Sequence, residues 1–248
     1  MPACNKLHCL ARSFIIYMMK RSTKTALIII PILMLLSCCL ISGISFYFYQ
    51  IKQDIDNKYR SYPLTLSAFQ TDERSRLLSE YNDLEDQRSS AWFEGNNTKI
   101  IELNEKAKTI EIKLDYLDSK TSGDLDKKRD KVDAFRRSIE KLPGGLARNI
   151  PGISDDRAIG IKIANAFVDE NDLETKLLDM LQKRTLLLTD LDQAYKDSAN
   201  GKLDIPGFSK ARNNVLEELE KMTKQEEKQV KLISQKSEDI RSLWAEYK

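Results

Sequence analysis

The longest apolar run in the chain covers residues 25–51 and contains no charged side chain. A helix needs roughly 20 such residues to cross the hydrocarbon core of a bilayer. A soluble domain rarely buries a segment that is so long and so uniformly apolar. The pattern therefore predicts one membrane-spanning helix over residues 25–51, preceded by a short tail over residues 1–24.

Beyond the span, apolar residues follow helical spacing. The clearest stripe covers residues 100–117, where the spacing alternates between three and four, and shorter stripes follow. A stripe of this kind makes a helix pack against another helix. The residues that we expect to form these packing seams are Ile100, Leu103, Ala107, Ile110, Leu114, Leu117, Leu173, Leu177, Met180, Val215, Leu219 and Met222.

Proline and glycine residues divide the outer part of the chain. A Pro-Gly-Gly sequence at 143–145 predicts a breaker loop over residues 143–154. It would separate a first helical, coiled-coil segment over 52–142 from a second helical segment over 155–248. Within the first segment, Thr-Ser-Gly at 121–123 favours an interruption and therefore two helices rather than one.

The second segment offers two helix starts. Asn171 and Glu174 have the spacing of a capping box, and Ser209 is a candidate start for the last helix. Isoleucines alternate over 159–163, which allows a short strand, but a helix is favoured because nothing else in the chain offers a strand partner. The predicted fold is all-α, with a single transmembrane helix followed by an elongated antiparallel bundle or coiled-coil hairpin domain of five to six helices.

The charge pattern predicts the orientation of the span. Lys6, Arg12, Lys20, Arg21 and Lys24 precede it without any acidic residue. Because positive residues stay in the cytoplasm, the N-terminus should be cytoplasmic and the helical domain extracytoplasmic. A bacterial inner membrane with a periplasmic domain is the favoured location. Five of the 40 basic residues lie in the tail, so 35 remain against 38 acidic ones, which gives no basic face for nucleic acid.

Two other interpretations of the N-terminal region remain open. A start at Met18 or Met19 would resemble a cleaved secretory signal, and Leu-Leu-Ser-Cys at 35–38 resembles a bacterial lipobox. The apolar run exceeds the usual signal length of about 7–15 residues, and further apolar residues follow Cys38. An uncleaved anchor is therefore preferred. Cys38 and Cys39 are small apolar helix residues in this interpretation, with acylation or an inter-chain disulfide as alternatives.

Catalytic and metal-binding residue types are scarce. The single histidine, His8, lies in the tail, and the four cysteines are Cys4, Cys9, Cys38 and Cys39. The outer domain therefore contains neither a histidine-based metal site nor a cysteine nucleophile, and no phosphate-binding loop motif occurs. We expect no enzymatic activity, no catalytic residue, no cofactor and no metal.

Three large aromatic residues stand outside the span. Trp92, Phe93 and Trp244 are expected to pack in the bundle, with a role as anchors for a partner protein as the alternative. The expected function is that of a membrane-anchored scaffold, adaptor or tether. It would act through helix–helix contacts with an unidentified protein or a second copy of the chain. The alternative is a sensor or signal-transmission subunit that couples an external ligand to a membrane partner.

Overall fold

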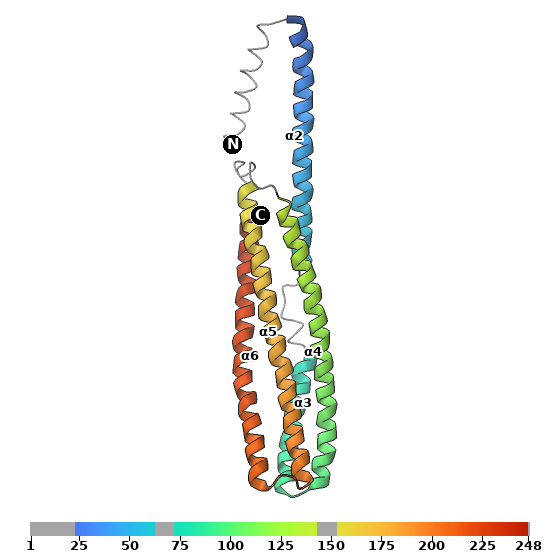
Figure 1. Cartoon of the computed structure of the whole chain (residues 1–248), viewed down its shortest axis with the longest axis vertical. Helices are drawn as coiled ribbons and strands as arrows, with labels where there is room; N and C mark the ends of the chain where they lie inside the picture. The colour runs from blue at the N-terminus through green and yellow to red at the C-terminus, as the bar shows by residue number, and fades with distance from the viewer. Residues whose placement is uncertain (1–22, 63–71, 143–152, 248) are drawn as a thin grey trace. The chain divides into compact units, whose positions relative to one another are not determined.

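A computed structural model of the chain describes residues 23–62, 72–142 and 153–247. Within these ranges the protein consists of α-helices joined by short turns, and they contain no strand. The all-helical prediction is confirmed, including the helix over residues 159–163. The helices are α2 (Thr23–Arg60), α3 (Asp72–Phe93), α4 (Asn97–Glu140), α5 (Ile153–Ala199) and α6 (Ile205–Tyr247), shown in Figure 1.

Helix α2 carries the apolar run. Of the described helices, it alone is long and apolar enough to cross a membrane, over Pro31–Arg60, a stretch of 30 residues. The apolar part is not buried against the rest of the chain, so side chains such as Leu35 and Leu40 are exposed. Length and composition thus fit a membrane span, and the exposure means that the described residues do not cover this surface.

Contacts within the chain define two units. Unit 1 contains Met1–Tyr62, Asp133–Ala164 and Leu243–Lys248, and unit 2 contains Pro63–Val132 and Asn165–Ser242. Helices α4, α5 and α6 contribute residues to both units. The predicted breaker loop at 143–154 lies outside the described residues except for its last two positions, which belong to α5.

Unit 2 packs α3 with parts of α4, α5 and α6. The turns from α3 to α4 and from α5 to α6 use Gly95 and Gly201, whose φ angles are 68° and 70°. Each helix end makes the paired backbone bonds of a Schellman motif: the Gly95 amide donates to the Trp92 carbonyl (3.0 Å) and the Asn96 amide to the Ala91 carbonyl (2.8 Å). These short turns explain why sequential helices are antiparallel neighbours.

The predicted seam of α4 forms the core of unit 2. All six of its residues between Ile100 and Leu117 are buried in one apolar cluster with residues of α3, α5 and α6, including Tyr81, Leu191 and Phe208. Of the other seam residues, Leu177 and Met222 are buried. Leu173, Met180, Val215 and Leu219 are half-buried.

Unit 1 contains the last turns of α2. Lys58 Nζ lies 2.5 Å from Asp54 Oδ2 and donates to Ser138 Oγ of α4 at 2.6 Å. Trp244 stacks on Tyr59 with ring centroids 3.7 Å apart and an interplanar angle of 6°. Polar and aromatic contacts thus attach the end of α2 to α4 and α6.

Two predicted interruptions do not form. Helix α4 continues through residues 121–123, where Thr121 Oγ1 donates to the Leu117 carbonyl (2.8 Å) and is satisfied inside the helix. Helix α5 continues through Asn171, because the Glu174 side chain contacts Lys128 of α4 instead of capping its own helix. Both signals were overridden by contacts that keep a helix intact.

The last helix begins four residues before the predicted Ser209. Asp204 Oδ1 accepts a hydrogen bond from the Gly207 amide at 2.8 Å, which caps the first turn of α6. A side chain on Gly207 would come within 2.7 Å of that same oxygen, so glycine leaves room for the cap.

Candidate functional site

The interior of unit 2 contains a set of charged side chains centred on Arg88, which we call the Arg88 network. Arg88 is fully buried and lies between the rings of Tyr81 and Tyr195, with centroid distances of 5.1 and 4.7 Å. Its guanidinium donates to Asn104 Oδ1 (3.0 Å) and to the carboxylate of Asp192. Helices α3, α4 and α5 are thereby joined through one cation.

A second cation completes the charge balance of this network. Glu85 accepts hydrogen bonds from Arg88 Nη2 (3.3 Å), from the Tyr195 hydroxyl (3.0 Å) and from Arg212 Nε (2.9 Å). Two guanidinium groups therefore face the carboxylates of Glu85 and Asp192. Burial raises the pKa of Glu85, while the neighbouring Arg88 and Arg212 act against that rise.

Glu111 brings a further carboxyl group to the edge of the network. It is buried, and Thr189 Oγ1 donates to its Oε2 at 2.9 Å. Burial, with the nearby carboxylate of Asp192, raises the pKa of Glu111 to about 8. Within the described structure, Glu111 Oε1 and Asp192 Oδ2 are buried without a partner, so a proton on Glu111 relieves the repulsion between the two carboxyl groups.

A separate buried cluster, the Lys128 cluster, joins α4 to α5 and α6. Lys128 Nζ lies 2.9 Å from Glu170 Oε2 and 2.6 Å from Glu174 Oε2, and all three residues are buried. Ser237 donates to the other oxygen of Glu170. Burial raises the pKa of Glu174 to about 7, against the opposing effect of Lys128.

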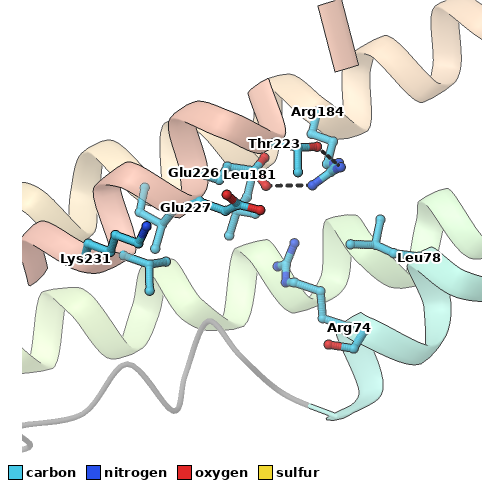
Figure 2. Close-up of a pocket in the computed structure, with 11 residues that line it drawn as sticks. Arg74, Leu78, Leu181, Arg184, Thr223, Glu226, Glu227 and Lys231 are labelled. Carbon is cyan, nitrogen blue, oxygen red and sulfur yellow. Dashed lines mark hydrogen bonds and ion pairs between the residues drawn. The ribbon is translucent and has the colours of Figure 1, made fainter. Parts of the chain in front are cut away.

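A cavity of about 360 Å³ opens between α3, α5 and α6 in unit 2 (Figure 2). Its apolar walls are formed by Leu78, Leu177, Leu181 and Val230. In Figure 2, Arg74 of α3 points into this space from one side, and the carboxylates of α6 lie across from it. The cavity has the mainly apolar lining and the few polar groups that are typical of small-molecule sites.

Ion pairs border the cavity. Arg74 pairs with Asp118 of α4. Arg184 of α5 donates to Glu226 Oε2 at 2.6 Å and to Thr223 Oγ1 at 2.8 Å, as Figure 2 shows. These contacts hold the polar groups in place on the wall. Within the described residues, no group of three or more His, Cys, Asp or Glu side chains is arranged to hold a metal.

The candidate partner anchors differ in exposure. Trp92 is half-buried, and its Nε1 donates to Ser198 Oγ at 2.8 Å. Trp244 is only 7% exposed and lies in the aromatic stack of unit 1, whereas Phe93 is 79% exposed. Of the three, Phe93 alone has a largely exposed ring. Cys38 and Cys39 are exposed on α2, and both are free cysteines in the chain.

The exposed apolar side of α4 was not among the predicted features. Ile101, Ile112 and Tyr116 are 46%, 62% and 70% exposed. The spacings of 11 and 4 residues place them along one side of the helix, away from the buried seam. These three positions fall on one side of a helical projection of the sequence, so the spacing itself contains the signal for this second stripe.

Comparison with protein-family models, with curated proteins and with solved structures finds no match to this chain. The assignment of a function therefore depends on the chemistry and the exposure of the residues described above.

Proposed function

We propose that the chain is a single-pass membrane protein whose helical domain acts as a scaffold, adaptor or tether. Helix α2 would hold it in the membrane, with the basic tail in the cytoplasm and the outer helices in an extracytoplasmic space. The bacterial periplasm is the favoured compartment. In support of this proposal, the described residues do not cover the apolar length of α2. Five basic residues precede the apolar run without any acidic residue, whereas the basic residues just after it, Lys52, Lys58 and Arg60, are interspersed with acidic ones.

The observation that carries the binding role is the exposed apolar side of α4. Ile112 and Tyr116 are neighbours one turn apart, and Ile101 continues the same side. Exposed Glu105 and Lys108 lie between them in the sequence. Apolar residues flanked by charges of both signs suit the face of another amphipathic helix, which would bury the apolar residues and pair the charges. We therefore propose a helical protein partner, with a second copy of this chain as one form of it.

The cavity of unit 2 favours a second function, that of a sensor or signal-transmission subunit. It lies between three helices, so a bound molecule would contact α3, α5 and α6 together. A ligand that binds one packing of these helices better than another would shift the population toward it. The scaffold remains the leading proposal because the exposed apolar side of α4 offers a contact surface without any change in helix packing.

Photo-crosslinking from Tyr116 tests the scaffold proposal. A photoreactive phenylalanine analogue replaces Tyr116 in the full chain, which is irradiated in native membranes. A matched variant carries the analogue at Lys224, an exposed position of α6 that forms an ion pair with Glu220. We expect a discrete adduct from position 116, either with another protein or at twice the mass of the chain, and none from position 224.

A charged substitution in the apolar side of α4 tests the specificity of that adduct. An I112E substitution combined with the analogue at position 116 should reduce the adduct at least tenfold, because a buried unpaired carboxylate strongly disfavours an apolar contact. Equal adducts from positions 116 and 224, or an adduct that survives I112E, would contradict binding through this side of α4.

A further inference from the structure

Two carboxyl groups at the edge of the Arg88 network each use only one oxygen as an acceptor. Asp192 accepts through Oδ1 from Arg88 and from the Tyr81 hydroxyl. Glu111 accepts through Oε2 from Thr189 Oγ1. The two carboxyl groups are within hydrogen-bond reach of each other, and in the described structure the remaining oxygens, Asp192 Oδ2 and Glu111 Oε1, are buried without a donor. One proton between the two groups would satisfy both oxygens.

The charges of the network leave no cation for an ionised Glu111. Among the described residues, Arg88 and Arg212 face Glu85 and Asp192, so two positive charges already balance two negative ones. The two tyrosine residues of the network stay neutral, because burial raises their pKa values. An ionised Glu111 would therefore add a third negative charge to an interior in which an unpaired charge is costly.

The two carboxyl groups differ in how firmly they are held. Besides the two donors to its side chain, Asp192 has a backbone carbonyl that accepts from Asn104 Nδ2 at 3.2 Å. Glu111 accepts one hydrogen bond, from Thr189 at 2.9 Å, and is 7% exposed, so it lies just beneath the surface of the bundle. When repulsion separates the two groups, Glu111 is therefore the one that moves.

An ionised Glu111 has a cation within reach on the outside of its own helix. Lys108 lies three residues earlier on α4, is exposed and forms no ion pair within the described structure. Side chains three residues apart on a helix are neighbours, so a change of rotamer brings the carboxylate of Glu111 to Lys108. Asp115, four residues later and also exposed, repels the carboxylate and favours the side of Lys108.

We propose that Glu111 is a proton-controlled switch with two positions. With a proton, it lies inside unit 2 and donates a hydrogen bond to Asp192 Oδ2. Without the proton, the carboxylate leaves the interior and pairs with Lys108, water enters beside Asp192, and α4 packs less tightly against α5. The change releases one proton and breaks no other covalent bond. It concerns the interior of unit 2 and does not depend on the scaffold function.

The surroundings of Glu111 set the pH at which the switch operates. Burial and the carboxylate of Asp192 raise its pKa to about 8, so the inner position should dominate near pH 6 and the outer position near pH 9.5. The titratable and charged groups around it are Tyr81, Glu85 and Arg88 of α3, Asp192 and Tyr195 of α5, Arg212 of α6, and Lys108 and Asp115 of α4 itself.

Infrared difference spectroscopy of the full chain in detergent detects this proton, because a protonated carboxyl group has a carbonyl band that a carboxylate lacks. Between about pH 6 and pH 9.5, the original chain should lose a band that is absent in E111Q. E174Q is the matched control, because Glu174 is a second buried carboxyl group with a raised pKa, in the separate Lys128 cluster. The Glu111 band should persist in E174Q.

Methyl NMR of the leucine residues measures the change in packing. Leu114 lies three residues from Glu111 on α4, and Leu191 adjoins Asp192 on α5; both belong to the apolar core of unit 2. Their signals should shift with a midpoint near pH 8, the pKa of Glu111, while buried Leu142 in unit 1 should not respond. E111Q should abolish the response, because its amide donates to Asp192 at every pH, and unchanged Leu142 signals report that the variant is folded.

The outer position is tested through its cation. K108Q removes the partner of the ionised form and should raise the midpoint by about 0.3 in pH. K106Q is the control, because Lys106 is exposed on the same helix and pairs with Glu102; it should leave the midpoint unchanged. Signals of Leu114 and Leu191 that do not depend on pH, or a band and a response that persist in E111Q, would overturn the proposal. Equal midpoints in K108Q and K106Q would refute the outer position.

Discussion

At the scale of single residues, Arg88 shows how unit 2 holds charge in its interior. Removing a guanidinium from water costs several kcal/mol, and a single ion pair rarely repays that cost. Here the cation has Asp192, Glu85 and Asn104 as hydrogen-bond acceptors and two tyrosine rings over its faces. Such a network contributes to the choice of one helix register, because a shift by one turn would leave several buried charges unpaired.

Glu111 gives a residue-scale prediction about pH. Its pKa is raised to about 8 in the folded chain, against about 4.3 for an exposed glutamate. The folded state therefore prefers the protonated form, and its contribution to stability is lost as the pH rises from about 4.3 through 8. In E111Q, the neutral amide replaces the protonated carboxyl group, so the variant should be more stable than the original by about 1 kcal/mol at pH 9 and nearly equal at pH 5.

Urea unfolding at pH 5 and pH 9, followed by circular dichroism of the full chain in detergent, measures this difference. E105Q on the exposed side of α4 is the control and should leave the pH dependence unchanged. If E111Q is less stable than the original chain at pH 9, burial and Asp192 do not raise the pKa of Glu111, and the prediction is wrong.

At the scale of helices, two glycines inside helices have opposite surroundings. Gly123 lies in the middle of α4, and a β-carbon placed on it would meet nothing within 4 Å. On Gly160 of α5, a β-carbon would lie 2.5 Å from Ile139 Cδ1 and 3.1 and 3.2 Å from its Cγ2 and Cγ1. Ile139 is fully buried in unit 1, so it has little room to move.

This contrast predicts opposite effects for one substitution. G123A should stabilise the chain by about 0.5–1 kcal/mol, because alanine restricts the unfolded chain and favours helix. G160A should destabilise it by about 1–2 kcal/mol, because overpacking against Ile139 outweighs the same helix gain. Urea unfolding of both variants in parallel measures the two values. A destabilising G123A would show that a break in α4 is needed, and a stabilising G160A would show that Ile139 yields easily.

Helix boundaries show where sequence patterns had limited power. The seam from Ile100 to Leu117 followed from spacing and residue type alone. The interruption at residues 121–123 and the cap at Asn171 were wrong because Thr121 bonds within its helix and Glu174 bonds to Lys128, 46 residues away. A local signal does not reveal that a distant side chain offers a better partner.

Most residues of the candidate sites could not be predicted from the sequence. Glu226, Arg184 and Arg74 look like ordinary charged residues on amphipathic helices, which are usually solvated. Only the packing of α3, α5 and α6 brings them to one cavity. Similarly, Trp92 and Phe93 are adjacent in the sequence, yet the first is half-buried and the second exposed, because neighbours on a helix point about 100° apart.

At the scale of the whole molecule, the distribution of charge around α2 predicts its orientation. Single cysteines are placed in an otherwise cysteine-free chain, at Cys9 in the tail or at Lys202 in the exposed turn between α5 and α6. In intact bacterial spheroplasts, a membrane-impermeant maleimide should label position 202 and leave Cys9 unlabelled until lysis. The chain should also remain in the membrane fraction after an alkaline wash.

The basis of this orientation is tested by neutralising the tail. Replacing Lys20, Arg21 and Lys24 with glutamine should lower the labelling of position 202 severalfold, because the charge bias that retains the tail is weakened. Labelling of Cys9 rather than position 202 in intact spheroplasts, or release of the chain by the wash, would rule out the proposed topology.

The sequence alone determined the helical class, the apolar stretch in α2 and the buried seam of α4, because each depends on the period and character of neighbouring residues. The tertiary structure decided which charges are buried, which aromatic rings are exposed and where a cavity remains. These properties depend on side chains that are distant along the chain and meet only when helices pack. A buried ion pair and a solvated one consist of the same residue types, and only packing distinguishes them.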